Sequence, residues 1–127
     1  MIVLLDSTDL IDALRARAGR LALLRDAVSA GHLLATSVVN VGEVYSGMRI
    51  GEEVRTEALL SNIECYPVTM EIARRAGELR NLWARKGRTL TLDDMIVAAT
   101  ALTHGAVLMT NNRKDFPVAG LRFYPMV

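Results

Sequence analysis

Short apolar runs alternate with longer amphipathic stretches along this chain of 127 residues. The run IVLL at 2–5 is apolar at successive positions, a pattern typical of a strand covered on both faces of a parallel sheet. Similar runs predict strands at 32–36, 64–68 and 106–110, and a weaker run predicts one at 121–126. The pattern therefore indicates a sheet of four to five short strands.

The stretches between these runs carry apolar residues at helical spacing, for example Leu10, Ile11, Leu14 and Ala18. They predict helices across 6–19, 20–31, 38–48, 52–63, 70–87 and 92–104. Thr91 stands directly before the last of these, where a hydroxyl side chain is a favoured N-cap. Strands that alternate with helices predict an α/β fold with a mainly parallel sheet flanked by helices.

The composition limits the class of protein. A chain of this length fits a single domain, so we expect one domain over 1–127. The net charge of +1 is too small for binding nucleic acid by overall charge, so a nucleic-acid partner has to be held by local basic patches. The single cysteine, Cys65, excludes an internal disulfide and a cysteine zinc site, and its apolar-leaning surroundings predict a reduced residue in the core.

Two features of the sequence predict a cytoplasmic protein. A reduced, lone cysteine suits the reducing conditions of the cytosol. The N-terminal apolar run stops after four residues, and no other stretch approaches the roughly 20 apolar residues of a transmembrane helix. We therefore expect neither a signal peptide nor a membrane partner.

Four acidic residues lie where a parallel sheet can gather them. Asp6 directly follows the first predicted strand, and Asp115 comes five residues after the strand at 106–110. Asp94 lies in the first turn of its predicted helix, and Glu43 lies inside another, mostly apolar helix. In open α/β sheets, ligands bind beyond the carboxyl ends of the strands, so these four side chains can reach one edge.

Taken singly, most of these acids also have a structural interpretation. Asp6 can cap the first helix, Asp94 fits the N3 position behind an N-cap at Thr91, and Asp115 can end a loop. Capping explains Asp94 and Asp115 somewhat better than a site does, and the two interpretations of Asp6 are equally good. Glu43 favours a functional role, because no cap accounts for a charge at the centre of an apolar helix.

Taken together, the four acids indicate a metal site. Carboxylates at one sheet edge repel one another and raise one another's pKa values. A hard divalent cation relieves this repulsion, and a set of oxygen ligands selects Mg²⁺ or Mn²⁺ over zinc. Such an ion polarises a phosphoryl oxygen and lowers the pKa of a bound water, which then attacks in line. If the four acids converge, the sequence predicts metal-dependent hydrolysis of a phosphate ester.

The sequence resembles the PIN-domain nucleases and, within that family, the VapC toxins of toxin–antitoxin pairs. The resemblance covers nearly the whole chain and is carried by LLDST at 4–8, ATSVVNVGEVYSG at 35–47 and LDDMIVAATALTHGAVLMTNNRKDF at 92–116. The last stretch is the most specific, since it combines the pattern D-x-x-[IV]-A-A-x-A with T-x-N-x-x-D-F. The resemblance implies a three-layer PIN-like domain and an endoribonuclease that depends on Mg²⁺ or Mn²⁺.

The resemblance also assigns roles to individual residues. It implies that the catalytic and metal-binding residues are Asp6, Glu43, Asp94 and Asp115. It implies that the supporting residues are Ser7, Thr110 and Asn112. The aspartate of the family stands three residues before the VAA triplet at 97–99, which selects Asp94 over its neighbour Asp93. Asn112 stands where some relatives have another acid, so whether Asn112 or Asp115 completes the fourth position stays open.

A cluster of carboxylates repels RNA, so cations have to hold the phosphates nearby. Segment 71–88 carries six basic residues against two acidic ones and leads directly into the helix of Asp94. The predicted RNA-binding residues are Arg85, Lys86, Arg88, Arg113 and Lys114. Trp83 shares a helix face with Ile72 and Leu79, which favours burial over stacking on a base.

Similarity to the VapC toxins implies three partners: an RNA substrate, a cognate antitoxin protein and a second copy of the chain in a homodimer. The alternative function is a catalytically weak PIN-like domain that binds RNA or a protein. The presence of Asp6, Glu43 and Asp94 argues against this alternative.

Overall fold

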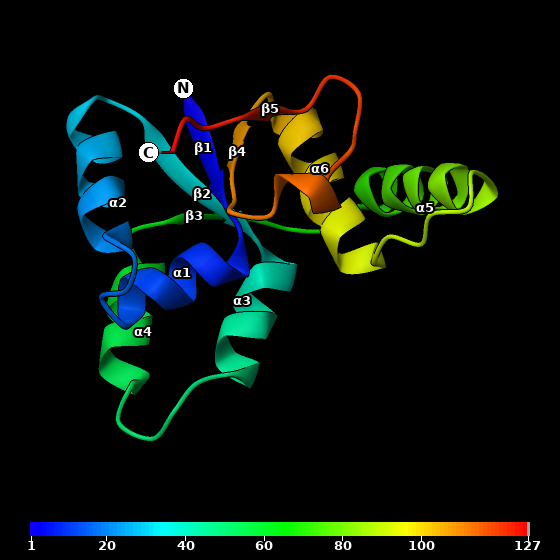
Figure 1. The fold of residues 1–127 in the computed structure, drawn as a ribbon. Coiled ribbons are helices and arrows are strands. Elements are labelled where there is room, and N and C mark those ends of the chain that lie inside the picture. Colours follow the sequence, from blue (N-terminus) through cyan, green and yellow to red (C-terminus); the bar gives the residue numbers. More distant parts are fainter. Residues whose placement is uncertain (127) are drawn as a thin grey trace.

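The computed structural model describes residues 1–126, which form a five-stranded sheet flanked by helices (Figure 1). The strands are β1 (Ile2–Leu5), β2 (Leu33–Ser37), β3 (Glu64–Tyr66), β4 (Val107–Met109) and β5 (Arg122–Phe123). The helices are α1 (Ser7–Leu14), α2 (Arg20–Ser29), α3 (Val38–Ser46), α4 (Glu53–Leu60), α5 (Met70–Arg85), α6 (Leu92–His104) and the 3₁₀ helix η1 (Arg113–Asp115). The strand order is β3-β2-β1-β4-β5 and every pairing is parallel, as the apolar runs predict.

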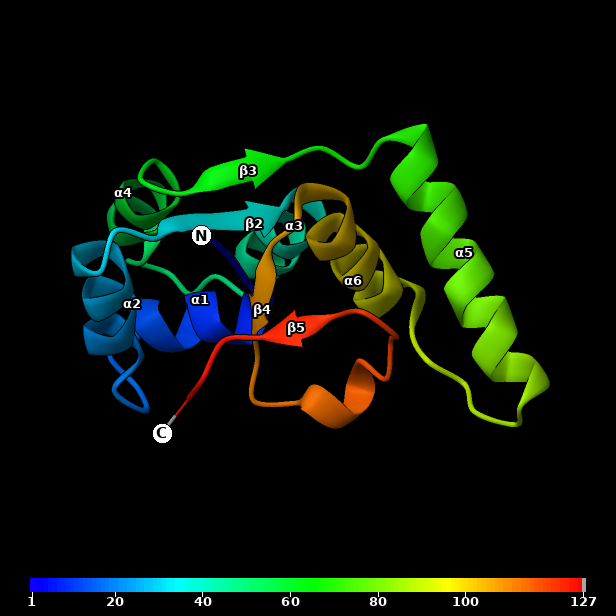
Figure 2. The ribbon, with the colours of Figure 1, turned by 90° about the horizontal axis from the view of Figure 1, so that it is seen from above.

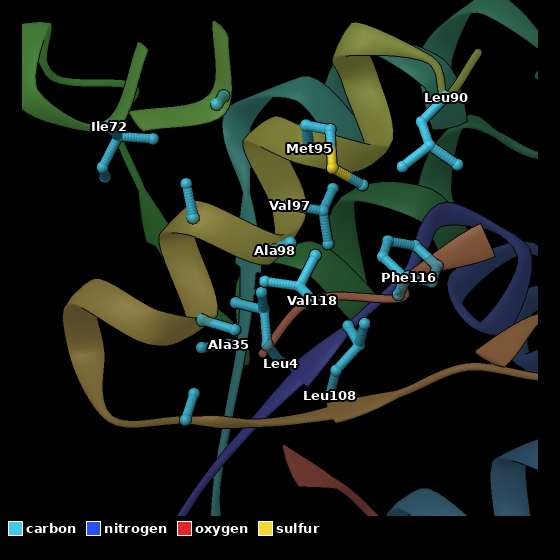
Figure 3. Packing of buried hydrophobic residues seen from close by; sticks show 14 residues of the cluster. Leu4, Ala35, Ile72, Leu90, Met95, Val97, Ala98, Leu108, Phe116 and Val118 are labelled. Carbon is cyan, nitrogen blue, oxygen red and sulfur yellow. The ribbon is translucent and has the colours of Figure 1, made fainter. Parts of the chain in front are cut away.

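Helices cover both faces of the sheet, so the domain has three layers (Figures 1 and 2). Side chains along β1 alternate between two cores. Val3 and Leu5 pack with residues of α1 to α4, whereas Leu4 packs with residues of α5 and α6. Figure 3 shows this second core, in which Leu4 and Leu108 of the sheet lie near Val97 of α6. Burial on both faces explains why the central strands are apolar at successive positions.

Helix α6 is the more deeply buried of the two helices that form the second core. Its small side chains Ala98 and Ala99 are fully buried and let the helix lie close to the sheet. Thr91 caps the helix as predicted, because its Oγ1 accepts a hydrogen bond from the backbone N–H of Asp94 at 3.2 Å. Gly105 ends the helix in the left-handed conformation, with φ of 63°. The first turn of α6, which carries the acidic pair, is therefore rigidly mounted.

Helix α1 ends at Leu14, so the prediction of one helix up to the next glycine was wrong. Ala16 and Ala18 have φ values of 52° and 54°, in the left-handed region, which cannot continue a right-handed helix. The turn returns the chain so that Arg20, the first residue of α2, reaches Asp9 within α1. The chain thus leaves the helix before Ala18, although its apolar residues keep helical spacing up to that position, and it forms the buried contact between Arg20 and Asp9.

The edges of the sheet also differ from the prediction. Strands β3, β4 and β5 are shorter than the apolar runs from which they were predicted. Cys65 is exposed, so its predicted place in the core was wrong. Because β3 is the edge strand next to β2, one side of it is open to solvent. A helix of the length and apolar character needed to span a bilayer is absent from residues 1–126.

A partly buried ion pair ties the end of α1 to the loop between α3 and α4. Glu52 accepts hydrogen bonds from Arg15 Nε at 3.1 Å and from the backbone N–H of Arg49 at 2.7 Å. Arg15 also donates to the carbonyl oxygen of Gly47 at 3.1 Å. The hydrogen bond from Arg15 and the one from Arg49 lower the pKa of Glu52 to about 2. The charged form of Glu52 is therefore strongly favoured in the folded protein.

Glu52→Gln is expected to lower stability in a pH-dependent way. The pKa of Glu52 falls from 4.5 to about 2 on folding, so its contribution is present above about pH 4.5 and is lost as the pH falls toward 2. Urea unfolding at pH 7, 5, 4 and 3 measures this contribution as the difference in unfolding free energy between wild type and variant. We expect the difference to be largest at pH 7 and to shrink steadily below pH 4.5. A difference that is equal at pH 7 and pH 3 would contradict the assignment.

Candidate functional site

Asp6 joins the first strand to the first helix. It directly follows β1 and is the N-cap of α1, where its Oδ1 accepts a hydrogen bond from the Ser7 backbone N–H at 2.8 Å. Its Oδ2 accepts a hydrogen bond from Thr110 Oγ1 at 3.3 Å, although the two residues stand 104 positions apart in the chain. The residue is only 8% exposed. Asp6 is thus both a helix cap and a buried acid at the carboxyl edge of the sheet.

Asp94 lies in the first turn of α6, between the surface and the core. Its neighbour Asp93 is exposed, whereas Asp94 is partly buried. Burial raises the pKa of Asp94, the hydrogen bond with Thr91 lowers it, and the charges of Asp115 and Asp93 raise it. The two neighbours therefore have different surroundings: the charge of Asp94 acts on the buried Asp6, whereas the exposed Asp93 acts mainly on Glu43.

Asp6, Asp94 and Asp115 form the inner part of an acidic cluster. Burial raises the pKa of Asp6; hydrogen bonds from Ser7 and Thr110 oppose this shift, and the charges of Asp94 and Asp115 add to it. These three carboxyl groups come from the end of β1, the start of α6 and η1. The sheet therefore gathers acids that are widely separated in the sequence.

Glu43 lies on the open side of this cluster. It projects from α3, and the residue as a whole is exposed. Partial burial of its carboxyl group raises the pKa of Glu43, and the charges of Asp93 and Asp6 raise it further, whereas the Ser7 side chain lowers it. All four predicted acids thus lie within electrostatic reach of the same edge of the sheet.

The donor set fits a hard cation in its chemistry, because all four candidate ligands are carboxylates that repel one another. The side chains do not yet form a coordination sphere. Within residues 1–126, no three His, Cys, Asp or Glu side chains stand in an arrangement that would hold a metal ion. An ion bound here would have to draw the carboxylates inward from their present positions.

The fourth position of the cluster has two candidates in the sequence, Asn112 and Asp115. The backbone N–H of Asn112 donates to Thr110 Oγ1 at 3.0 Å, and the residue is exposed. Asp115 is partly buried, and its charge acts on both Asp6 and Asp94. Asp115 therefore contributes a carboxylate to the cluster, whereas Asn112 orients the hydroxyl that binds Asp6.

Several of the predicted RNA-binding cations have partners inside the protein. Arg88 donates to the carbonyl oxygen of Lys114, which joins the loop before α6 to η1. Arg113 donates to the carbonyl oxygen of Tyr124 at 3.1 Å. Lys86 lies over the ring of Trp83, 4.9 Å from its centroid. Trp83 is partly buried against the second core, as its helical spacing predicts. Arg88, Arg113 and Lys114 are all exposed, and of these Arg88 and Arg113 are held by carbonyl oxygens of the protein.

Two buried polar contacts near the cluster were not indicated by the sequence pattern. The first is an ion pair between Asp9 Oδ1 and Arg20 Nε at 2.8 Å, in which Arg20 also donates to Asn111 Oδ1 at 3.1 Å. The ion pair lacks hydrogen-bond alignment, and neither carboxylate oxygen of Asp9 has a hydrogen-bond donor among the described residues. Burial raises the pKa of Asp9 to about 7 even though Arg20 lowers it. In the sequence, Asp9 resembles an ordinary helix cap and Arg20 a surface cation.

The second contact is made by Asn40, which is fully buried on the same helix as Glu43. Its side chain reaches the carbonyl oxygen that precedes Asp6. An asparagine within an apolar helix, three residues before a candidate ligand, was the available signal in the sequence.

The PIN domain family matches residues 3–120, so the protein belongs to that family. Ribonuclease VapC10 of Mycobacterium tuberculosis is 36% identical over 117 residues, which are 92% of this chain and 87% of that protein. Ribonuclease VapC19 of the same organism is 32% identical over 115 residues, which are 91% of this chain and 92% of that protein. The chain therefore belongs to the VapC branch of the PIN family.

Solved structures show the same fold. VapBC2 from Rickettsia felis, bound to a DNA fragment from its promoter, superposes with a TM-score of 0.85 over 98% of each chain at 22% identity. A toxin–antitoxin complex from Klebsiella pneumoniae superposes with a TM-score of 0.78 over 98% of each chain at 30% identity. These likenesses confirm the three-layer PIN-like fold with a parallel sheet.

Proposed function

We propose that this protein is a metal-dependent endoribonuclease and the toxin of a toxin–antitoxin pair. The observation that carries the proposal is the gathering of Asp6, Glu43, Asp94 and Asp115 at one sheet edge of a VapC-family chain. Its relatives VapC10 and VapC19 are named as ribonucleases, which supports RNA as the substrate.

The four carboxylates would hold Mg²⁺ or Mn²⁺, which supplies charge stabilisation and a more acidic bound water when present. The residues of the chain prepare this site. Thr110 and the Ser7 N–H orient the two oxygens of Asp6, and the buried face of α6 fixes Asp94. Thr110 is itself oriented by the backbone N–H of Asn112. Such outer contacts fix the direction and basicity of metal ligands.

Lys114 is the best-placed cation for an RNA phosphate. Lys114 is exposed and lines a polar hollow together with Thr110, Asn111 and Arg113. Thr110 is the residue whose hydroxyl group donates a hydrogen bond to Asp6. Arg85 and Lys86 are exposed at the end of α5 and extend the basic surface away from the cluster. Arg88 and Arg113 have internal partners, so we assign them mainly to fixing the loops that carry the other cations.

Removing divalent metal tests the proposed reaction. Purified protein is incubated with structured and single-stranded RNA in Mg²⁺, in Mn²⁺, in EDTA, and in EDTA followed by excess metal. We expect cleavage at internal sites with metal, none above background in EDTA, and full recovery when metal is restored. Cleavage that persists in EDTA contradicts the metal mechanism. Tight RNA binding without cleavage under every condition would instead favour the alternative, a catalytically weak RNA-binding module.

We propose a cognate antitoxin as the partner that restrains the enzyme. The solved structures named above are toxin–antitoxin complexes, which supports such a partner here. A groove between α2 and α4 is lined by apolar side chains that include Leu24, Val28 and Leu59, and by Arg25. This surface suits an apolar segment with acidic flanks. A homodimer is the further assembly that we propose.

A further inference from the structure

A closed set of hydrogen bonds surrounds the last carbonyl group of β1. The carbonyl oxygen of Leu5 accepts hydrogen bonds from Thr36 Oγ1 at 2.9 Å and from Asn40 Nδ2 at 3.0 Å. Asn40 Nδ2 also donates to Thr36 Oγ1 at 3.1 Å. Both side chains are fully buried. Thr36 belongs to β2 and Asn40 to α3. Figure 1 shows that β2 passes into α3 beside the junction of β1 and α1.

These hydrogen bonds constrain the backbone of Asp6. The peptide unit is planar, so a fixed Leu5 carbonyl also fixes the direction of the Asp6 N–H and of the bond to its Cα atom. The Asp6 N–H itself reaches the carbonyl oxygen of Met109 only at 3.4 Å, near the limit for a hydrogen bond. The stronger restraint on this peptide unit therefore comes from Thr36 and Asn40.

The same amide also holds the helix that carries Glu43. Helix α3 fully buries two of its residues, Asn40 and Val44, and one of these two side chains is polar. Asn40 and Glu43 are three residues apart on one helix, which places them on neighbouring positions of its surface. The hydrogen bond from Asn40 to the Leu5 carbonyl oxygen therefore also sets the direction of Glu43 relative to the end of β1.

Stability alone does not account for this asparagine. Its Oδ1 is buried and has no hydrogen-bond partner among the described residues, which is unfavourable. A valine would fill much of the same buried space without an unpaired acceptor. The property that valine lacks is the NH₂ group, whose nitrogen lies within hydrogen-bond distance of both the Leu5 carbonyl oxygen and Thr36 Oγ1.

We propose that Asn40, together with Thr36, is a positioning residue that sets the spacing of Asp6 and Glu43 for a divalent cation. The proposal rests on the metal-dependent function proposed above. It assigns a role in metal affinity to two residues that touch neither the metal nor the RNA.

Mn²⁺ binding and RNA cleavage of matched valine variants test this role. Thr36→Val and Asn40→Val each remove donors to Leu5. Thr56→Val is the control, because Thr56 is equally buried and donates to the carbonyl oxygen of Glu52 at 2.7 Å, within the first turn of α4. Free Mn²⁺ is measured by electron paramagnetic resonance without RNA, and cleavage is measured across a Mn²⁺ titration. Thermal unfolding in EDTA shows that each variant is folded.

We expect the two site variants to bind Mn²⁺ about 10- to 100-fold more weakly than wild type, as found for outer contacts of metal sites. Their cleavage should recover at saturating Mn²⁺, whereas Thr56→Val keeps wild-type affinity at a similar loss of melting temperature. If Asn40→Val does not fold, Thr36→Val still decides the result. Wild-type affinity in a folded site variant, or an equal loss in Thr56→Val, overturns the positioning role and leaves the nuclease function intact. A wild type that neither binds Mn²⁺ nor cleaves RNA overturns both.

Discussion

Asp94→Asn is expected to slow RNA cleavage about 1000-fold, whereas Asp93→Asn should change the rate by less than about 10-fold. A metal ion contributes several kcal/mol of charge stabilisation, and each 1.36 kcal/mol corresponds to a tenfold rate change. Losing a ligand carboxylate removes much of that contribution. The two substitutions are chemically identical and adjacent, so they separate the partly buried acid from its exposed neighbour.

Unfolding measurements tell a lost ligand from a damaged fold. Burial and nearby charges raise the pKa of Asp94, so the charged form of this residue lowers the stability of the folded protein when no metal is bound. A neutral amide at this position removes that electrostatic penalty. The cap is kept, because Thr91 Oγ1 accepts a hydrogen bond from the backbone N–H of residue 94, which the substitution leaves in place. Asp94→Asn should therefore melt at or above the wild-type temperature in EDTA and gain less stability from Mn²⁺ than wild type does. Equal cleavage by the two variants, or a greater loss with Asp93→Asn, would contradict our assignment.

Arg20→Met is expected to destabilise the protein by about 3–5 kcal/mol at pH 8, because it leaves the buried carboxylate of Asp9 without its ion-pair partner. The pKa of Asp9 is already raised to about 7, and loss of Arg20 raises it further. A raised carboxyl pKa penalises the charged form, so stability falls as the pH rises through the folded pKa. The loss should therefore be smaller at pH 5, where Asp9 takes up a proton.

Urea unfolding at pH 5 and pH 8 measures both parts of this expectation. Arg74→Met is the control, because Arg74 pairs with Glu71 on the exposed surface of α5 and such pairs contribute little to stability. The double variant Asp9→Leu with Arg20→Met should recover part of the lost stability, since a buried pair can be replaced by apolar side chains. A loss for Arg20→Met that is no larger than for Arg74→Met would show that the buried pair is unimportant.

Much of the fold could be predicted from the sequence because the central strands are buried on both faces. Leu4 and its neighbours in β1 are apolar at every position for that reason, and alternation of strands with helices then leaves few topologies. Strand ends were predicted less well. β5 has only two residues, whereas the apolar run from Leu121 extends further along the chain.

The candidate site could be predicted only in part. Acids that follow strands, such as Asp6, are visible in the sequence because position along a parallel strand determines the sheet edge. The choice of Asp94 over Asp93 needed similarity to a family, since the physics of capping allows both. The position of Asn40 in an apolar helix is a signal in the sequence, but the partners of Asn40 and Arg20 were not predictable, because each contact joins segments whose separation depends on the finished packing.

The hydrogen bond between Thr110 and Asp6, across 104 residues, also bears on when activity can arise during synthesis. A nascent chain that ends before residue 92 already contains Asp6 and Glu43 but lacks Asp94, Asp115 and β4, the strand beside β1. Such a chain has half of the acidic cluster and an unpaired edge on its central strand. The proposed acidic cluster therefore assembles only after residues 92–115 have been synthesised, so the first two acids wait in the growing chain for the last two.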